Sequence, residues 1–298
     1  MSAPRISVVI ASVNGLPAID ECLTALERQR GDIDAEIVVA DRCGDGTSRH
    51  IRKKFPHVKL LEFSERLSIP ELRAIGMSHA TGDIITVTED HCMAREDWYL
   101  EILKAHESAY AAVGGAVENG SDHRILDWAV YLCEYSHVML PIPDGEVDGI
   151  AGNNASYRRD VLDQVGESVK RNYWESFLHE ELKKNGVQFL SAPSIVVDHK
   201  KEFGFLYFLR QRYHYSRSFA GMRRTRMSIP KRVFYIVGSP LLPFLLIGRI
   251  AFRVFRKKRH YKEFLLSFPV LSIFMASYAF GEFVGYLLGP GNSLIEVE

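Results

Sequence analysis

Three adjacent polar residues, Glu89, Asp90 and His91, have the types and spacing that most directly suggest chemistry. They follow a short run of β-forming residues, Asp83–Val87, and each can bind a metal ion. Such a cluster at the end of a buried strand suits Mg²⁺ or Mn²⁺ carrying a diphosphate, because hard divalent cations accept carboxylate and phosphate oxygens together. The alternative is a strand end whose acidic residues cap the next helix. The surrounding elements favour the metal site.

The N-terminal part of the chain alternates short apolar runs, typical of strands, with stretches of helical apolar spacing. Strands separated by helices predict βαβ units, a parallel sheet and an α/β fold. The predicted strands are Ile6–Ile10, Glu36–Ala40, Lys59–Phe63 and Asp83–Val87, and the predicted helices are Ile19–Leu26 and Ile69–His79.

Polar residues follow these strands, where an open α/β sheet binds its ligand. Ser12 and Asn14 come after the first strand, residues 41–47 after the second and residues 89–91 after the fourth. The chain has no GxGxxG after its first strand and no GxxxxGK[ST] anywhere, which argues against a standard dinucleotide site or P-loop.

Four motifs in this order resemble the inverting glycosyltransferases of family 2, which have the GT-A fold and use nucleotide-diphosphate sugars. The motifs are Arg5–Asn14, Glu36–Thr47, Pro70–Gly76 and Glu89–His91. The resemblance implies that Asp41 holds the nucleobase, that Arg73 contacts the nucleotide, and that Glu89, Asp90 and His91 occupy the metal-binding DxD position. The residues it assigns to donor binding are Ser12, Asn14, Asp41, Arg73 and Glu89.

The chain departs from the family pattern at the metal motif. His91 replaces the second aspartate, the residue that the family most often bonds to the metal. Neutral imidazole can bind Mn²⁺, so the expected cofactor is Mn²⁺ or Mg²⁺. Ala11 and Val13 stand where the family usually has a proline and an aromatic residue.

The second half of the pattern contains the candidate catalytic base. Residues 152–159, Gly-Asn-Asn-Ala-Ser-Tyr-Arg-Arg, are similar to the family's acceptor-side loop, and residues 173–186 are similar to the helix that follows it. Counting back from Gly186 puts Glu175 at the position of the base. At 100° per residue, Glu175 shares the apolar face with Leu178 and Leu182, and the helix dipole would help to keep it ionised.

Two alternatives remain open for this helix. Glu175 could be an ordinary first-turn acid favoured by the same dipole, and Glu180 is the nearest competitor for the role of base. An inverting transfer needs one base and one cation but no covalent nucleophile, so Cys22, Cys43, Cys92 and Cys133 need no catalytic role.

His199 ends another apolar strand, Ile195–His199, where related enzymes often place a histidine that reaches the metal or the diphosphate. We therefore include it among the candidate metal ligands. The alternative is a structural histidine whose hydrogen bonds are satisfied within the protein.

The C-terminal third differs in composition, and we expect three parts: a catalytic domain over residues 1–200, a basic amphipathic interface helix or linker over 201–232, and a membrane-associated hydrophobic hairpin over 233–298. The apolar stretch Phe264–Gly289 is long enough to span a bilayer or to return as one limb of a hairpin. The stretch Val233–Gly248 is shorter and has basic residues on both sides, which favours a re-entrant or interfacial segment. The alternative is a buried helical hairpin in a soluble homo-oligomer.

These features predict a membrane-associated, metal-dependent inverting glycosyltransferase that moves one sugar from a nucleotide-diphosphate donor to a lipid or lipid-linked acceptor. Met1–Pro4 is too short and polar for a signal sequence, so we expect the catalytic domain on the cytoplasmic side. The zero net charge argues against a nucleic-acid partner. The alternatives are a transferase acting on a soluble or protein acceptor with the tail as an anchor, and a non-catalytic protein that binds nucleotide sugars.

Overall fold

The computed structural model describes residues 6–31, 33–166 and 174–297. Arg5 and Tyr173, which begin two of the motifs above, lie outside the described residues. The chain divides into two compact units. The first contains Met1–Gly120 and Val138–Lys200, and the second contains Ser121–His137 and Lys201–Glu298.

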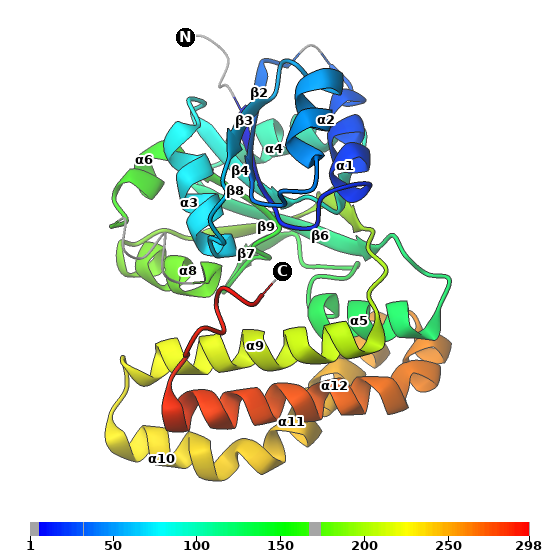
Figure 1. The fold of residues 1–298 in the computed structure, drawn as a ribbon, viewed down its shortest axis with the longest axis vertical. Coiled ribbons are helices and arrows are strands. Elements are labelled where there is room, and N and C mark those ends of the chain that lie inside the picture. Colours follow the sequence, from blue (N-terminus) through cyan, green and yellow to red (C-terminus); the bar gives the residue numbers. More distant parts are fainter. Residues whose placement is uncertain (1–5, 32, 167–173, 298) are drawn as a thin grey trace. The chain divides into compact units, whose positions relative to one another are not determined.

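A mixed α/β sheet forms the centre of the first unit, with the strand order β3-β2-β1-β4-β8-β6-β9-β5 among the described residues and β7 paired to β9 (Figure 1). The pairs β3–β2, β2–β1 and β1–β4 are parallel, as the βαβ pattern predicts. From β8 onward, parallel and antiparallel pairs are mixed. The strands are β1 (Ile6–Ser12), β2 (Ala35–Asp41), β3 (Lys59–Glu62), β4 (Ile84–Glu89), β5 (Cys92–Ala94), β6 (Ala112–Asn119), β7 (Gly145–Val147), β8 (Asn154–Arg158) and β9 (Phe189–His199).

Helices connect these strands, and each strand and helix predicted between Ile6 and Val87 is found within a few residues of its expected bounds, whereas β9 begins six residues before the predicted Ile195. The helix α2 was not predicted, because Ile51 is its only residue from the aliphatic and aromatic set and no apolar repeat is visible. The helices of the first unit are α1 (Ala18–Glu27), α2 (Thr47–Lys54), α3 (Ile69–His79), α4 (Trp98–His106), α6 (Arg159–Asp163) and α8 (Glu175–Lys184).

Local sequence fixes the start of α3, the helix that carries Arg73. The Ser68 hydroxyl accepts a hydrogen bond from the Glu71 backbone N–H, and the Glu71 carboxylate accepts one from the Ser68 backbone N–H at 2.7 Å. This reciprocal capping sets where the helix begins. About two turns after the cap, Gly76 lies against β1, where a β-carbon would come within 2.5 Å of the Val9 side chain. Arg73 is consequently held on the buried face of the helix.

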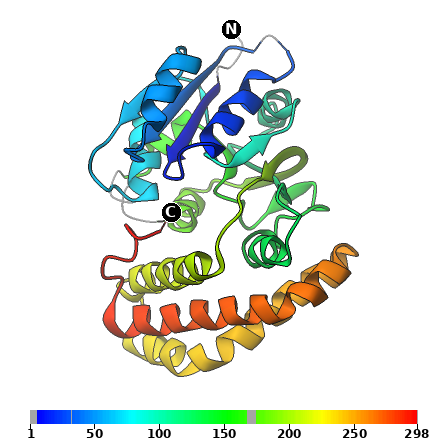
Figure 2. The same cartoon turned by 45° about the vertical axis from the view of Figure 1, so that its right-hand side comes forward.

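The second unit is helical, and it contains α5 (Ile125–Tyr135), α9 (Phe205–Arg224), α10 (Ile229–Gly238), a short 3₁₀ helix η1 (Ser239–Leu241), α11 (Leu242–Lys257) and α12 (Tyr261–Leu288). Within this unit α12 lies between α9 and the α10–α11 pair (Figures 1 and 2). By length and composition the segments Ile229–Lys257 and Tyr261–Leu288 could each cross a membrane.

The helices of this unit extend beyond the apolar stretches of the sequence. The stretch Val233–Gly248 ends within α11, which continues through the basic residues to Lys257, because arginine and lysine are good helix formers. The unit also takes in Ser121–His137, which lies within the residues 1–200 that we assigned to the catalytic domain.

Candidate active site

Three of the predicted metal ligands come together in the first unit. Glu89 ends β4, His91 follows in the turn, and His199 ends β9. One ligand atom from each lies within 4.8 Å of the other two, and His91 Nε2 is 3.5 Å from Glu89 Oε2. The pairing of β5 with β9 brings the histidines together, because Cys92 is the register partner of His199 and the His91 carbonyl accepts a 2.8 Å hydrogen bond from the Lys200 N–H.

Asp90, the fourth predicted ligand, points elsewhere. Its fully buried carboxylate accepts hydrogen bonds from the backbone N–H groups of Val13 and Asn14 at 2.9 and 2.8 Å, and from the Asn14 side-chain amide at 2.9 Å. His91 Nδ1 lies 2.7 Å from the same carboxylate. Burial alone would raise the pKa of Asp90, but the hydrogen bonds from His91 and Asn14 outweigh it and hold this pKa below its usual value.

The Asp90 contact has a consequence for His91. A carboxylate beside Nδ1 favours the tautomer that carries its proton there, which leaves the Nε2 lone pair directed toward Glu89. Asp90 therefore orients a candidate ligand and also ties the loop after β1 to the metal motif.

The donor set fits a divalent cation of the Mn²⁺ type. Glu89 supplies carboxylate oxygen, and the two histidines supply imidazole nitrogen. Ligand atoms about 2.1 Å from a common ion lie roughly 3–4 Å apart, so small side-chain adjustments would bring these three to an ion. The perpendicular rings of His91 and His199, with centroids 4.6 Å apart, leave both imidazoles beside the Glu89 carboxylate.

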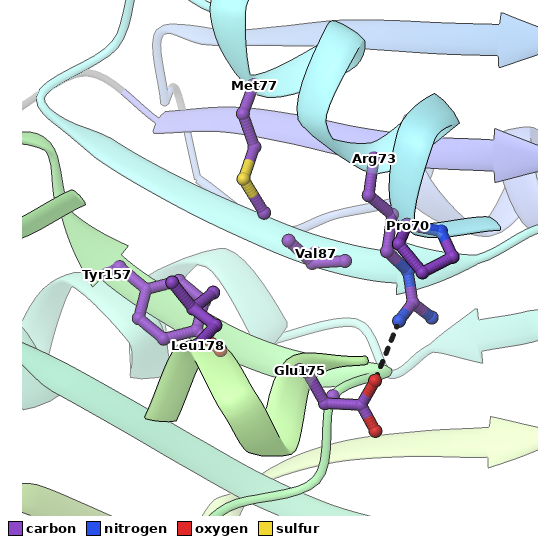
Figure 3. A pocket seen from close by; sticks show the side chains of 8 residues that line it. Pro70, Arg73, Met77, Val87, Tyr157, Glu175 and Leu178 are labelled. Carbon is purple, nitrogen blue, oxygen red and sulfur yellow. Dashed lines mark hydrogen bonds and ion pairs between the residues drawn. The ribbon is translucent and has the colours of Figure 1, made fainter. Parts of the chain in front are cut away.

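Arg73 links the metal cluster to the candidate base. Its guanidinium is 3.4 Å from Glu175 Oε2, a contact drawn in Figure 3, and it is 3.0 Å from Glu89 Oε1. The arginine side chain is only 9% exposed, so its charge requires nearby carboxylates. Residues far apart in the sequence therefore form one charged group, in which a single arginine is shared by two acids.

Glu175 is the first residue of α8, and its carboxylate reaches a small cavity of about 30 Å³. The other lining residues are mostly apolar: Pro70, Met77, Val87, Tyr157 and Leu178, together with Arg73 and Gly152 (Figure 3). Such a cavity has room for a water molecule or a hydroxyl group. Glu180, the competing base, is exposed on the same helix and does not line this cavity.

The wall of the cavity is held by a buried polar pair. The Tyr157 hydroxyl lies 2.7 Å from His179 Nε2. Burial lowers the pKa of His179 to about 4 and raises that of Tyr157, so both groups are neutral at pH 7 and share this hydrogen bond. His179 is thus a partner of Tyr157, one turn of helix after Glu175.

The predicted nucleobase residue, Asp41, lies at the end of β2 and is almost fully buried. Its Oδ2 accepts a 2.6 Å hydrogen bond from the Ser48 hydroxyl on α2, and Oδ1 accepts one from the Cys43 N–H at 3.3 Å. Ser12 lies nearby, with its hydroxyl 3.6 Å from the Cys43 sulfur. The structure therefore groups Asp41 with Ser12, and Asn14 with Asp90.

The roles of three residues of the site were not predicted from the sequence. The Asn153 amide donates to Glu89 Oε2 at 3.3 Å, and Ser48 binds Asp41. Gly152 leaves the space that Glu175 fills, since a β-carbon there would lie 2.3 Å from Glu175 Cγ. The Gly-Asn-Asn motif was a visible signal for two of them, whereas the polar helix that carries Ser48 gave none.

The sequence profile of glycosyl transferase family 2 matches residues 7–166, more than half of the chain. The chain therefore belongs to glycosyltransferase family 2, and its mixed sheet flanked by helices is the GT-A fold.

Particular relatives come from both sequence and structure. Polypeptide N-acetylgalactosaminyltransferase 10 of Rattus norvegicus is 33% identical over 87 residues, which is 27% of this chain and 14% of that protein. Polypeptide N-acetylgalactosaminyltransferase 12 of Mus musculus is 25% identical over 138 residues, which is 43% of this chain and 23% of that protein. The chain thus matches less than a quarter of the length of either relative.

Solved structures share the fold at low sequence identity. The mannosyltransferase PcManGT from Pyrobaculum calidifontis, in complex with GDP-Man and Mn²⁺, has a TM-score of 0.63 and 18% identity, covering 97% of this chain and 88% of that chain. TarS (residues 1–349) from S. aureus has a TM-score of 0.52 and 14% identity, covering 94% and 90%. GalNAc-T7, crystallised with UDP, GalNAc and Mn²⁺, has a TM-score of 0.51 and 14% identity, covering 67% and 44%.

The first prediction concerns the nucleotide. If Asp41 holds the base, Asp41→Ala should weaken nucleotide binding by about 1–3 kcal/mol, because a charged hydrogen-bond partner is lost. Isothermal titration with UDP and GDP measures the effect. Asp45→Ala is the matched control, since Asp45 lies in the same loop but bonds Thr47 within it at 2.6 Å. Identical isotherms for the parent and Asp41→Ala would remove Asp41 from the binding site.

Proposed function

We propose that the protein is a metal-dependent inverting glycosyltransferase that moves one sugar from a UDP- or GDP-sugar to a lipid or lipid-linked acceptor at the cytoplasmic face of a membrane. One observation carries the proposal: Arg73 joins the Glu175 carboxylate to a carboxylate–histidine–histidine cluster at the carboxyl ends of the strands. A base and a cation site side by side are the two groups that direct displacement at a sugar carbon requires.

The residues divide the work as follows. Glu89, His91 and His199 would hold Mn²⁺ or Mg²⁺, which neutralises charge on the departing diphosphate when bound. Glu175 accepts the proton of the acceptor hydroxyl, and the apolar walls of its cavity limit the access of water. Asp41 holds the nucleobase, with Ser12 at the end of β1 and Asn14 in the loop that follows. Attack opposite the leaving group inverts the configuration of the sugar carbon.

Arg73 has two roles in this scheme. In the structure its single positive charge is shared between the Glu89 and Glu175 carboxylates. If Glu89 held a cation, the Arg73 guanidinium would be available to a negatively charged diphosphate, a group that a planar guanidinium binds well. The same side chain thus supports the acidic cluster before donor binding and the donor afterwards.

The membrane part of the proposal is supported by the second unit. Its apolar helices make up two stretches of sufficient length, and the window of highest hydropathy in the first is only 11% buried. Water-exposed apolar surface of this extent is unfavourable unless something covers it. A lipid acceptor would be supplied by the membrane that covers this surface.

A thermal-shift panel of UDP, GDP and their sugars, each with and without Mn²⁺, tests donor binding, because a ligand that binds only the folded state raises the melting temperature. We expect one nucleotide sugar to raise it in a metal-dependent way. Incubation of that labelled donor with a lipid extract should then move label into the organic phase. Transfer to peptides instead, as the names of the polypeptide transferases suggest, would replace the lipid acceptor, and an absence of any shift would contradict donor binding.

A further inference from the structure

The outer face of the α10–α11 pair is apolar and exposed. Phe234 and Phe244 are 71% and 74% exposed, and Val237 and Leu241 are similarly open. Residues of this kind normally account for small scattered patches on a soluble surface, so a continuous row along two successive helices marks a surface that another phase or molecule covers. The question is how a membrane would meet it.

The second half of α12 packs against α9 along its length. Phe274 packs on Phe208 with ring centroids 4.7 Å apart, and the Ser277 hydroxyl donates to the Leu209 carbonyl at 2.8 Å. Farther along, a β-carbon at Gly281 would lie 2.4 Å from the Tyr213 carbonyl oxygen. The two backbones are therefore as close as small residues permit, and the two helices act as one element.

Helix α9 is unsuited to hydrocarbon. It carries five arginines within its 20 residues, and Arg212 forms an ion pair with Glu134 of α5. A helix that crosses a bilayer needs about 20 predominantly apolar residues. Any such window of α12 includes the segment 274–280 that packs on α9, so a crossing would pull the arginines of α9 into the bilayer with it.

The charge distribution favours an anionic surface. From Phe203 to Lys262 the sequence has 15 lysines and arginines and no aspartate or glutamate. Basic residues stand at both ends of the apolar row: Lys231 near the start of α10, and Arg256 and Lys258 around the end of α11, are exposed. Cations at both ends of a helix pair would lie on opposite sides of a membrane if the pair crossed it, whereas all can meet headgroups if it lies flat.

Resting on the membrane association proposed above, we infer that the second unit is monotopic. Helices α10, α11 and α12 run parallel to the surface of an anionic phospholipid membrane, with the row containing Phe234 and Phe244 inserted between the headgroups and neither long segment crossing. The two segments are long and apolar enough to span a membrane, but here they form a flat apolar surface instead. Helix α9 lies on the other side of α12.

Labelling from the two sides of a membrane tests the inference. Lys262→Cys and Asn292→Cys place thiols at exposed positions near opposite ends of α12. The full-length variants are expressed in bacteria, and an impermeant maleimide is applied to spheroplasts and to inverted vesicles, with the labelling of the parent cysteines subtracted. We expect both positions to react in inverted vesicles and neither in spheroplasts. Reaction of either position in spheroplasts would show a crossing and overturn the inference.

A second measurement identifies what covers the apolar row. Phe234→Ser with Phe244→Ser should reduce sedimentation of the purified protein with phosphatidylglycerol-containing vesicles at least tenfold, since each buried phenylalanine contributes a factor of roughly ten or more. Leu206→Ser is the matched control, because Leu206 is 71% exposed but lies on α9. Equal loss in the control would overturn the assignment of the inserted face.

The same samples separate this inference from the proposed function. Metal-dependent donor binding, measured by thermal shift, should be unchanged in all four variants, because the substitutions lie outside the first unit. If the parent protein does not bind vesicles and is a stable dimer in solution, a second copy of the chain covers the apolar row. That result would overturn both the inference and the membrane association. Crossing with intact donor binding would overturn the inference alone.

Discussion

Replacing Glu175 by glutamine should lower turnover by about 10²-fold or more while nucleotide binding persists, because the change removes the proton acceptor and keeps the shape of the side chain. Single-turnover transfer from the donor identified by thermal shift provides the measurement. The 3.4 Å contact with Arg73 loses its charge in this variant, but Arg73 retains Glu89 as a partner at 3.0 Å, so the site should keep its structure.

The control for this experiment lies on the same helix. Glu180→Gln makes the same chemical change at an exposed position that does not line the cavity, and it should leave turnover near the parent value. The reverse pattern, with Glu175→Gln active and Glu180→Gln impaired, would transfer the role of base to Glu180. Near-normal turnover in both variants would leave neither as the base.

Loss of the metal should have an effect of similar size. We expect Glu89→Gln to weaken metal-dependent nucleotide binding by about 10²-fold or more, because the only carboxylate among the three clustered ligands loses its charge. Titration of the nucleotide at several Mn²⁺ concentrations measures the change. Asp90 is a poorer choice for substitution, since its carboxylate also holds the backbone of Val13 and Asn14.

Two controls accompany the metal experiment. His91→Asp restores the residue usual in the family, and it should retain activity with a preference shifted toward Mg²⁺, since an oxygen ligand replaces a nitrogen ligand. Exhaustive chelation of the parent should abolish transfer, and added Mn²⁺ should restore it. Activity that survives chelation would make the metal hypothesis wrong.

Much of the first unit could be predicted because its signals are local. Apolar runs mark β1 through β4, and the polar residues that follow them lie at the strand ends as expected. The meeting of His199 with Glu89 and His91 depends on β9 pairing with β5, whose residues lie more than 100 positions earlier, and no local pattern fixes such pairing. Only the resemblance to the family pointed to His199, and the roles of these residues stay predictions.

The orientation of Asp90 shows a different limit. Adjacent residues at a strand end point in different directions, and which of three polar neighbours faces the cluster depends on the shape of the turn. The direction of Asp90 is set by the hydrogen-bond donors near it. A buried carboxylate needs such donors, and the loop after β1 offers the backbone N–H groups of Val13 and Asn14. Both partners are visible in the sequence, but no sequence pattern shows that Asp90 bonds to the loop after β1.

The hydrogen bonds between Asp90 and the loop after β1 also affect how the chain folds. The N–H groups of Val13 and Asn14 receive their acceptor from a residue 76 positions after Asn14, so the loop after β1 cannot take its final form during synthesis until β4 has emerged and joined the sheet. The loop after β1 and the turn that carries the predicted metal motif are therefore completed in the same step. A nascent chain has either both or neither, so the two halves of the proposed donor site would form together.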